Sequence, residues 1–162
     1  WGKWFYLFAW LGVLVFGTWA FEKMLSQQKN PNQQVQTILT REGVKKVVLE
    51  RNRYGHYVVN GWINDQLVEL MVDTGASDVS IPETLAKSLQ LKSGAPSTYM
   101  TANGPITAYR TRIDKMQIGD IVLNDVRASI NPAVDDITVL VGMSFLKQIE
   151  FTQKGNQLIL AQ

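Results

Sequence analysis

The sequence contains no cysteine and only one histidine, His56. Without cysteine, the chain can form no disulfide bond, zinc finger or thiol nucleophile, although this does not identify the redox compartment. A single imidazole also excludes a metal site built from several histidines. His56 falls in a predicted strand with no evident acidic or hydroxyl partner, so a surface position is favoured over a catalytic one.

An excess of charge of one sign is also lacking. The 162 residues include 16 lysines and arginines and 14 aspartates and glutamates, for a net charge of +2. The basic residues are scattered, so no basic stripe predicts binding to nucleic acid. The acidic pair Asp135-Asp136 is alone in a predicted loop, where a solvated surface is favoured over a metal site. The length allows one domain plus extensions.

A long uncharged run is present at the N-terminus, from Phe5 to Phe21. Its seventeen residues are just enough to span a bilayer. A cleaved signal peptide and a buried core helix are the alternatives, but Thr18-Trp19-Ala20 is a poor cleavage site. We therefore expect a transmembrane anchor over residues 1–25. The flanking lysines do not decide its orientation.

The next segment, residues 26–37, is polar and is interrupted by Pro31. Because it lacks an apolar period, we expect a flexible stalk. From residue 38 to 162 the pattern changes to short strands rich in Val, Ile, Tyr and Leu, separated by turn residues. The strands are predicted at 45–50, 56–60, 66–72, 79–81, 97–101, 106–118, 121–130, 138–141, 149–152 and 157–160.

One helix is predicted directly after the strand at 79–81. Ser80-Ile-Pro-Glu83 matches a capping box, which would open a helix that ends at Leu89. Many short strands with one or two short helices predict an all-β fold, a small closed or nearly closed barrel.

The motif that carries chemistry is Asp73-Thr74-Gly75, which follows an apolar strand and occurs once. Two aspartates that share one proton can activate water and protonate a carbonyl oxygen without metal or cofactor. A chain with one such aspartate needs a second copy to supply the other. The plainer interpretation is a strand-ending turn, for which these residue types are also suited. A second apolar run, Val139 to Gly142, lies about 70 residues later and favours the catalytic interpretation.

With these features, residues 45–160 resemble the retropepsin-like aspartic proteases, and in particular bacterial membrane-anchored members. The resemblance rests on Leu70 to Ser77, on the Asn103-Gly104 hairpin, and on Val139 to Leu146. It implies an aspartic endopeptidase that acts on peptides as a homodimer and uses no cofactor or metal. It also implies a bacterial inner membrane, crossed once through residues 5–21, with the protease domain in the periplasm.

The resemblance further implies roles for individual residues. The catalytic residues are Asp73, Thr74 and Gly75, and the flap that covers the substrate is Tyr99 to Tyr109. Gly142 corresponds to the glycine of a segment that crosses behind the catalytic loop. The residues expected to contact substrate come from the loop and the flap: Ala76, Ser77, Asp78, Ala102, Asn103 and Gly104.

Two positions depart from the retroviral pattern. Retroviral enzymes usually carry Asp where this chain has Ser77 and Arg where it has Met143, and these two residues pair near the dimer interface. Core packing is the favoured role of Met143, whereas Ser77 and Asp78 could contact substrate or cap the turn.

Ser144 lacks the second glycine of a nucleophile elbow, which excludes a serine hydrolase. The alternative function is a non-proteolytic module that keeps this fold for dimerisation or peptide binding.

Overall fold

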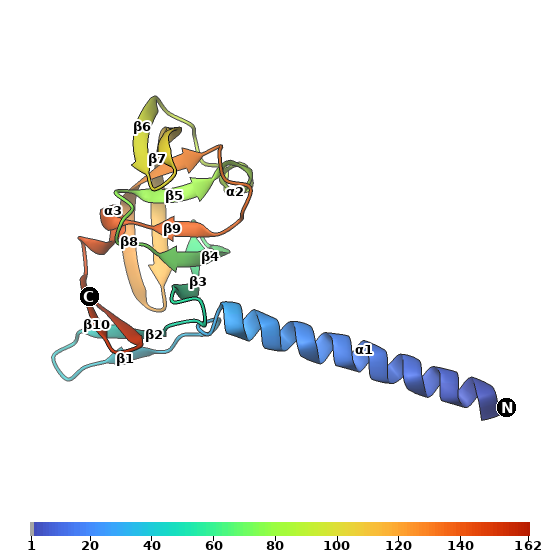
Figure 1. The fold of residues 1–162 in the computed structure, drawn as a ribbon. Coiled ribbons are helices and arrows are strands. Elements are labelled where there is room, and N and C mark those ends of the chain that lie inside the picture. Colours follow the sequence, from blue (N-terminus) through green and yellow to red (C-terminus); the bar gives the residue numbers. More distant parts are fainter. Residues whose placement is uncertain (1) are drawn as a thin grey trace.

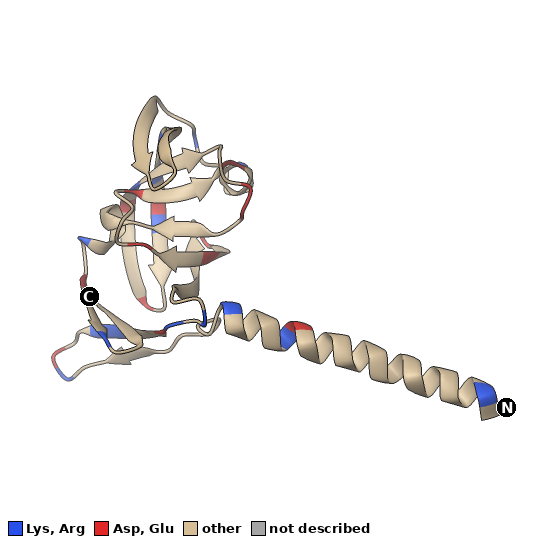
Figure 2. Ribbon diagram, in the orientation of Figure 1, with Lys and Arg blue, Asp and Glu red and all other residues tan. Residues whose placement is uncertain are grey.

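The computed structural model describes residues 2–162, and its first element is a long helix, α1 (Gly2–Lys29). The helix projects from the rest of the molecule (Figure 1), and none of its residues is buried. Its 28 residues span about 42 Å, which exceeds the bilayer core of about 30 Å. Figure 2 shows the uncharged stretch between Lys3 and Glu22. The helix is therefore long and apolar enough to cross a membrane.

The joint between α1 and the following domain differs from the expected stalk. The helix continues to Lys29, and Asn32 is buried at 4% exposure. The Asn32 side-chain amide donates to the carbonyl oxygens of Glu50 at 2.9 Å and Val58 at 2.8 Å, and its oxygen accepts from the Glu50 amide at 2.7 Å. The Asn32 side chain thus forms hydrogen bonds with backbone groups of two neighbouring segments, as an adjacent strand would. The division into anchor, stalk and protease domain as such remains a prediction.

Six strands close a barrel. The strand order is β3-β4-β9-β5-β8-β7, and β7 pairs back to β3. The flap strand β6 continues this sheet beyond β7. The bounds are β3 (Tyr57–Ile63), β4 (Gln66–Val72), β5 (Val79–Pro82), β6 (Pro96–Thr101), β7 (Gly104–Ile118), β8 (Ile121–Asn131) and β9 (Val139–Val141). The expected all-β barrel is confirmed.

The sequence predicted that the strand beginning at residue 56 ends at residue 60, but β3 runs through Gly61 to Ile63. The reason is the barrel seam, where Trp62 pairs with Gln117 of β7. A Cβ on Gly61 would lie 2.6 Å from the Gln117 carbonyl oxygen. Glycine is needed here because two strands approach closely, and the turn falls instead at Asn64-Asp65, where both φ angles are positive.

A second, four-stranded antiparallel sheet joins the two ends of the domain. Its order is β1-β2-β11-β10, with bounds β1 (Thr37–Leu39), β2 (Lys45–Glu50), β10 (Glu150–Lys154) and β11 (Gln157–Ala161). One face packs on the barrel through Val47, Leu49, Leu158 and Leu160, all buried. The sheet lies below the barrel in Figure 1. The two outer strands of this sheet are β1 and β10.

Two short helices complete the domain. The helix α2 (Glu83–Ser88) starts later than expected, because Ser80 lies within β5 and Pro82 precedes the helix without a side-chain cap. The capping-box prediction was therefore wrong, although the helix exists. The helix α3 (Met143–Leu146) follows β9 and buries Phe145 and Leu146 in the core.

Candidate active site

Asp73 stands at the end of β4, where the chain turns sharply. Its backbone amide donates to the Val141 carbonyl at 3.1 Å, which ties the loop to β9. Its carboxylate accepts from the Gly75 amide at 2.9 Å, and its carbonyl accepts from the Ala76 amide at 3.2 Å. The carboxylate is therefore held by the loop that follows it while its side chain stays half-buried.

The strand β9 and the helix α3 support this loop from behind. β9 lies between β4 and β5, parallel to β4 with Val72 opposite Val141. At the start of α3, the Met143 amide donates to the Ala76 carbonyl at 2.8 Å and the Ser144 amide to the Ser77 carbonyl at 3.0 Å. The later segment thus crosses behind the loop that carries Asp73.

Gly142 allows this crossing. A Cβ at this position would lie 2.2 Å from the Asp78 carbonyl oxygen and 2.6 Å from that of Ala76. These are backbone atoms, which cannot move aside as a flexible side chain could. Gly75 differs, because its Cβ would meet only Asp73 Oδ1, at 3.2 Å, and its φ is not positive. The conformation of a single chain therefore does not require glycine at the position of Gly75.

A cavity of about 360 Å³ opens between the loop and the flap. It brings together six of the nine site residues predicted from the sequence: Asp73, Gly75, Ala76, Ser77, Asp78 and Ala102. Thr74, Asn103 and Gly104 do not line it. Four more lining residues belong to the predicted flap: Tyr99, Met100, Thr101 and Ile106. The rest of the wall was not predicted as part of the site: Ser80, Ser129, Asn131 and Leu140. Placement at the cavity leaves each residue's role a prediction.

The flap is the hairpin of β6 and β7, as the sequence indicated. Its two-residue turn is Ala102-Asn103, one residue earlier than predicted, because Thr101 pairs with Gly104. Gly104 has a φ of +106°, and the Thr101 hydroxyl donates to its carbonyl at 2.7 Å. Glycine supplies the positive φ that closes the hairpin.

Asp78 belongs to a polar cluster that links the loop, β8 and the flap. Its carboxylate accepts from Arg127 Nε at 2.6 Å and from the Tyr99 hydroxyl at 3.0 Å. The Asp78 side chain is 8% exposed and the Arg127 side chain 63% exposed, so the carboxylate is shielded from water while the guanidinium remains solvated. Burial, together with the hydrogen bond to Asp78, raises the pKa of Tyr99. Tyr99 therefore stays protonated and donates to Asp78 at neutral pH.

Sequence reasoning missed the partner of Asp78. Arg127 lies 49 residues away on β8, and nothing in its local sequence distinguishes it from the other arginines. The pair is a carboxylate with a guanidinium, which is also the chemistry of the retroviral pair absent from Ser77 and Met143. Met143 packs against the core instead.

Ser144 has a structural role in the observed contacts. Its hydroxyl accepts from the Val79 amide at 2.9 Å and donates to the Arg127 carbonyl at 2.7 Å. These bonds join α3 to β5 and β8, and the hydroxyl proton is used in a hydrogen bond to a backbone carbonyl. The geometry agrees with the exclusion of a serine nucleophile.

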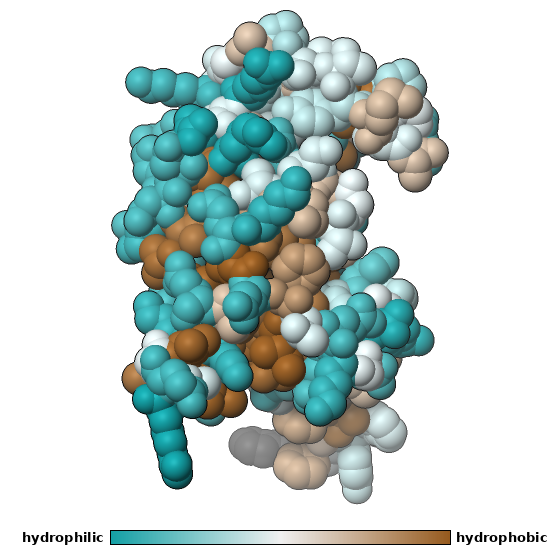
Figure 3. All heavy atoms as spheres, turned by 90° about the vertical axis from the view of Figure 1, so that its left-hand side faces the viewer, coloured by the Kyte–Doolittle hydropathy of each residue, from teal (hydrophilic) through white to brown (hydrophobic). Residues whose placement is uncertain are grey.

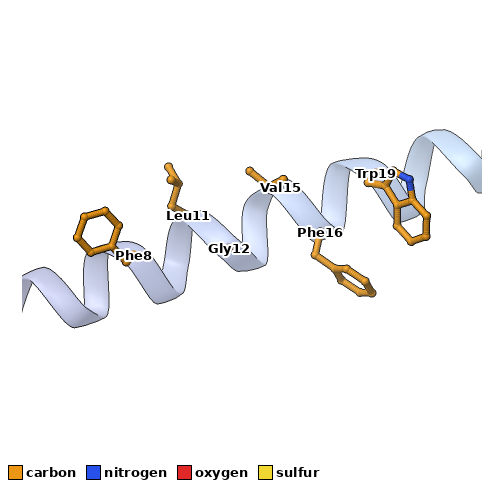
Figure 4. A pocket seen from close by; sticks show the side chains of 6 residues that line it. All are labelled: Phe8, Leu11, Gly12, Val15, Phe16 and Trp19. Carbon is orange, nitrogen blue, oxygen red and sulfur yellow. The ribbon is translucent and has the colours of Figure 1, made fainter.

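A separate hollow lies on α1 and is unrelated to Asp73. It is formed along the helix by Phe8, Leu11, Gly12, Val15, Phe16 and Trp19 (Figure 4). None of these side chains carries a charge or an acid-base group. The hollow is part of the apolar surface of the helix.

The cavity thus has two carboxylates with different environments. Asp78 is neutralised by Arg127, whereas the contacts of Asp73 within residues 2–162 include no ion pair. Thr74 is exposed beside Asp73. Asp73 is thus the cavity carboxylate without a counter-ion among the described residues, and its catalytic role stays a prediction.

Comparisons with known proteins agree with this geometry. The family described as "gag-polyprotein putative aspartyl protease" matches residues 59–148. A Sinorhizobium protein encoded in the 5′ region of cobV is 31% identical over 121 residues, which cover 72% of this chain and 52% of the relative. A protein of Rickettsia prowazekii strain Madrid E is 31% identical over 110 residues, or 66% of this chain and 47% of the relative. The chain therefore spans about half the length of the curated relatives it matches.

Among solved structures, a retropepsin-like aspartic protease from Rickettsia conorii is similar, with 30% sequence identity and a TM-score of 0.63. The match covers 79% of this chain and 95% of that chain. The closed barrel, with its Asp-Thr-Gly loop backed by β9 and α3, therefore has the retropepsin-like fold. This chain belongs to the retropepsin-like aspartic protease family.

Proposed function

We propose that this protein is a membrane-anchored aspartic endopeptidase that is active as a homodimer, with Asp73 from each copy forming the catalytic pair. The observation that carries the proposal is the cavity wall, in which Asp73 is the carboxylate without an ion pair. A single free carboxylate cannot serve as both base and acid, so the second must come from another copy.

The chemistry follows from the electrostatics of two close carboxylates. Two aspartates at hydrogen-bond distance hold one proton between them over a broad acid to neutral range. The ionised Asp73 removes a proton from a water molecule, whose oxygen attacks the scissile carbonyl carbon. The protonated Asp73 of the second copy donates to the carbonyl oxygen. As the carbon–nitrogen bond breaks, the first Asp73 gives the proton that it took from water to the leaving amine, and the second Asp73 takes back the proton on the former carbonyl oxygen.

The position of the flap over the cavity favours the binding of an extended peptide at this site. Thr101 and Ala102 face the same cavity as Asp73, so a peptide between them would lie under β6 and β7. Closure of such a hairpin excludes water other than the attacking molecule. Ala76, Ser77 and Asp78 form the opposite wall, with Asn103 and Gly104 at the tip of the flap.

The proposed location is the inner membrane of a bacterium, crossed once by residues 5–21, with the protease domain in the periplasm. The uncharged stretch of α1 between Lys3 and Glu22, in a helix without buried residues, supports the membrane part of this proposal. The relatives from Sinorhizobium and Rickettsia support a bacterial setting. Confinement to a membrane would also raise the effective concentration of the two copies.

The test is cleavage of a denatured peptide library by the full chain in detergent micelles. We expect pepstatin-sensitive cleavage that Asp73→Asn abolishes, because the amide can neither ionise nor share the proton. Asp120→Asn, at an exposed site outside the cavity, should retain full activity. A demonstrably dimeric sample that cleaves nothing between about pH 4 and 7 would contradict the proposal and favour the non-proteolytic module.

A further inference from the structure

The outer edge of β10 is an open sheet edge. Within residues 2–162, β10 pairs only with β11, and all five of its residues are exposed. The strand has neither a proline nor a bulge, which are common devices that protect an edge. Its outer N–H and C=O groups are therefore available to another strand.

The sequence of β10 is complementary to itself. It reads Glu150-Phe151-Thr152-Gln153-Lys154. In an antiparallel pair with its own copy, centred on Thr152, each Glu150 faces Lys154 of the second copy. Opposite charges directly across an antiparallel pair are favourable. Centring the pair on Phe151 or Gln153 instead would lose both of these charge pairs.

The apolar side chain of β10 also gains from this register. Phe151 shares the barrel-facing side of the sheet with its neighbour Leu160, yet is 37% exposed at the edge. The two Phe151 side chains would lie diagonally across the two-fold axis, at a spacing that aromatic rings can reach. The new pair would bury surface that one copy leaves open.

The strand β10 lies on the side of the domain from which a second copy could approach the loop that carries Asp73. In Figure 1, β10 and the C-terminus lie on the same side of the molecule as α3, which holds the carbonyls of Ala76 and Ser77. The helix α1 leaves the domain on the other side. Figure 3 looks onto the face with β10 and α3 and shows hydrophobic residues gathered in its middle with hydrophilic residues around them.

The other edge strand of this four-stranded sheet, β1, is a weaker candidate. β1 has three residues, Thr37, Ile38 and Leu39, and carries no charge that could set a register. An arbitrary peptide added to β10 would not match both Glu150 and Lys154. A second copy matches both by symmetry.

We propose that β10 pairs antiparallel with β10 of a second copy, about a two-fold axis at Thr152, and so forms an eight-stranded sheet under the two barrels. The catalytic meaning of this pairing rests on the proposed function, because the sheet would bring the two Asp73 loops to one interface. The pairing itself depends only on β10.

Cross-linking tests the register in a chain that has no native cysteine. In detergent micelles, Thr152→Cys should form a disulfide dimer under mild oxidation, because residues opposite each other on paired strands have Cβ atoms about 5 Å apart. Glu150→Cys is the matched control on the same exposed strand. Its two copies would lie about 13 Å apart along the strand and should cross-link about tenfold less. Mixing Glu150→Cys with Lys154→Cys should restore the dimer.

Charge reversal tests the same register without cysteine. Glu150→Lys and Lys154→Glu should each weaken the dimer by about tenfold, because two attractive pairs become repulsive. The double variant E150K/K154E should recover the wild-type dissociation constant, measured by sedimentation in micelles. Equal cross-linking of Thr152→Cys and Glu150→Cys, or no effect of charge reversal, would overturn the pairing.

Peptide cleavage in the same samples separates the two proposals. Cleavage that depends on Asp73 but occurs without Thr152→Cys cross-linking would overturn the β10 interface and leave the proposed function intact. Cross-linking without any Asp73-dependent cleavage would support the interface and contradict the protease. If both proposals hold, the oxidised Thr152→Cys dimer should stay active at dilutions where the wild type loses activity.

Discussion

At the scale of single residues, two carboxylates in one cavity differ through their neighbours. Asp78 is buried and paired with Arg127, which fixes it as part of the scaffold. Within residues 2–162, the Asp73 carboxylate accepts a hydrogen bond only from the Gly75 amide of its own loop. The sequence places both near one strand end, but only the ion pair distinguishes the structural from the candidate catalytic carboxylate.

Gly142 gives a prediction about packing. Gly142→Ala should lower the free energy of unfolding by about 2 kcal/mol or more, because the new Cβ meets the backbone oxygens of Asp78 and Ala76. Thermal unfolding of the full chain in micelles would measure this. Gly75→Ala is the comparison, and its unfolding should change little because its Cβ meets one side-chain oxygen. Equal losses for the two variants would refute this account of the crossing.

Tyr99 gives a second prediction. Tyr99→Phe removes the hydrogen bond to Asp78 and should cost about 1 kcal/mol of stability. Tyr57→Phe is the control, because the buried Tyr57 hydroxyl has no hydrogen-bond partner within residues 2–162. We expect Tyr57→Phe to be neutral or stabilising in urea unfolding. A greater loss for Tyr57→Phe than for Tyr99→Phe would contradict this expectation.

The same tyrosine predicts a dependence on pH. Burial and the bond to Asp78 raise the pKa of Tyr99 in the folded state. The resulting stability is fully present below the ordinary tyrosine pKa of about 10 and is lost as the pH rises through the raised folded pKa. Unfolding measured from neutral to alkaline pH should therefore show a steeper alkaline loss for the wild type than for Tyr99→Phe. Parallel curves would rule out this linkage.

At the scale of elements, the joint after α1 shows how a polar segment becomes ordered. Lys29 pairs with Glu69 of β4 at 2.9 Å, and Asn32 bridges β2 and β3. Composition alone predicted a flexible stalk, because Gln, Asn and Pro form no apolar pattern. Their order depends on backbone groups of strands that are distant in the sequence.

Asn32 gives the corresponding prediction. Asn32→Ala should destabilise the domain by about 3 kcal/mol, because it leaves buried groups of Glu50 and Val58 without partners. It should also speed limited proteolysis after α1. Gln34→Ala, at an exposed neighbour, should change stability by less than about 0.5 kcal/mol. Similar proteolysis of both variants would show that Asn32 does not secure the joint.

The strands themselves were largely predictable. The strands predicted at 45–50 and 66–72 match β2 and β4 to the residue. The short strand β1 was not predicted. Two further errors fall at Gly61, which lies in a strand because of the barrel seam, and at Ser80, which lies in β5 instead of capping a helix. In these two cases a tertiary contact overrode a local turn or cap signal.

At the scale of the whole molecule, the proposed dimer predicts how activity depends on concentration. If two copies assemble the site weakly, activity per chain should fall as the full chain is diluted in micelles. Initial rates of peptide cleavage over a dilution series would measure this. A strictly linear dependence of rate on protein concentration in the dilute range would contradict a weak dimer.

The sequence by itself determined the apolar helix, the succession of strands and the Asp-Thr-Gly loop at the end of one of them, because each depends on local pattern. Only the tertiary structure decided that Arg127 neutralises Asp78, that Tyr99 joins the flap to that pair, and that β10 is left at an open edge. These depend on contacts between residues far apart in the chain, which no local pattern encodes.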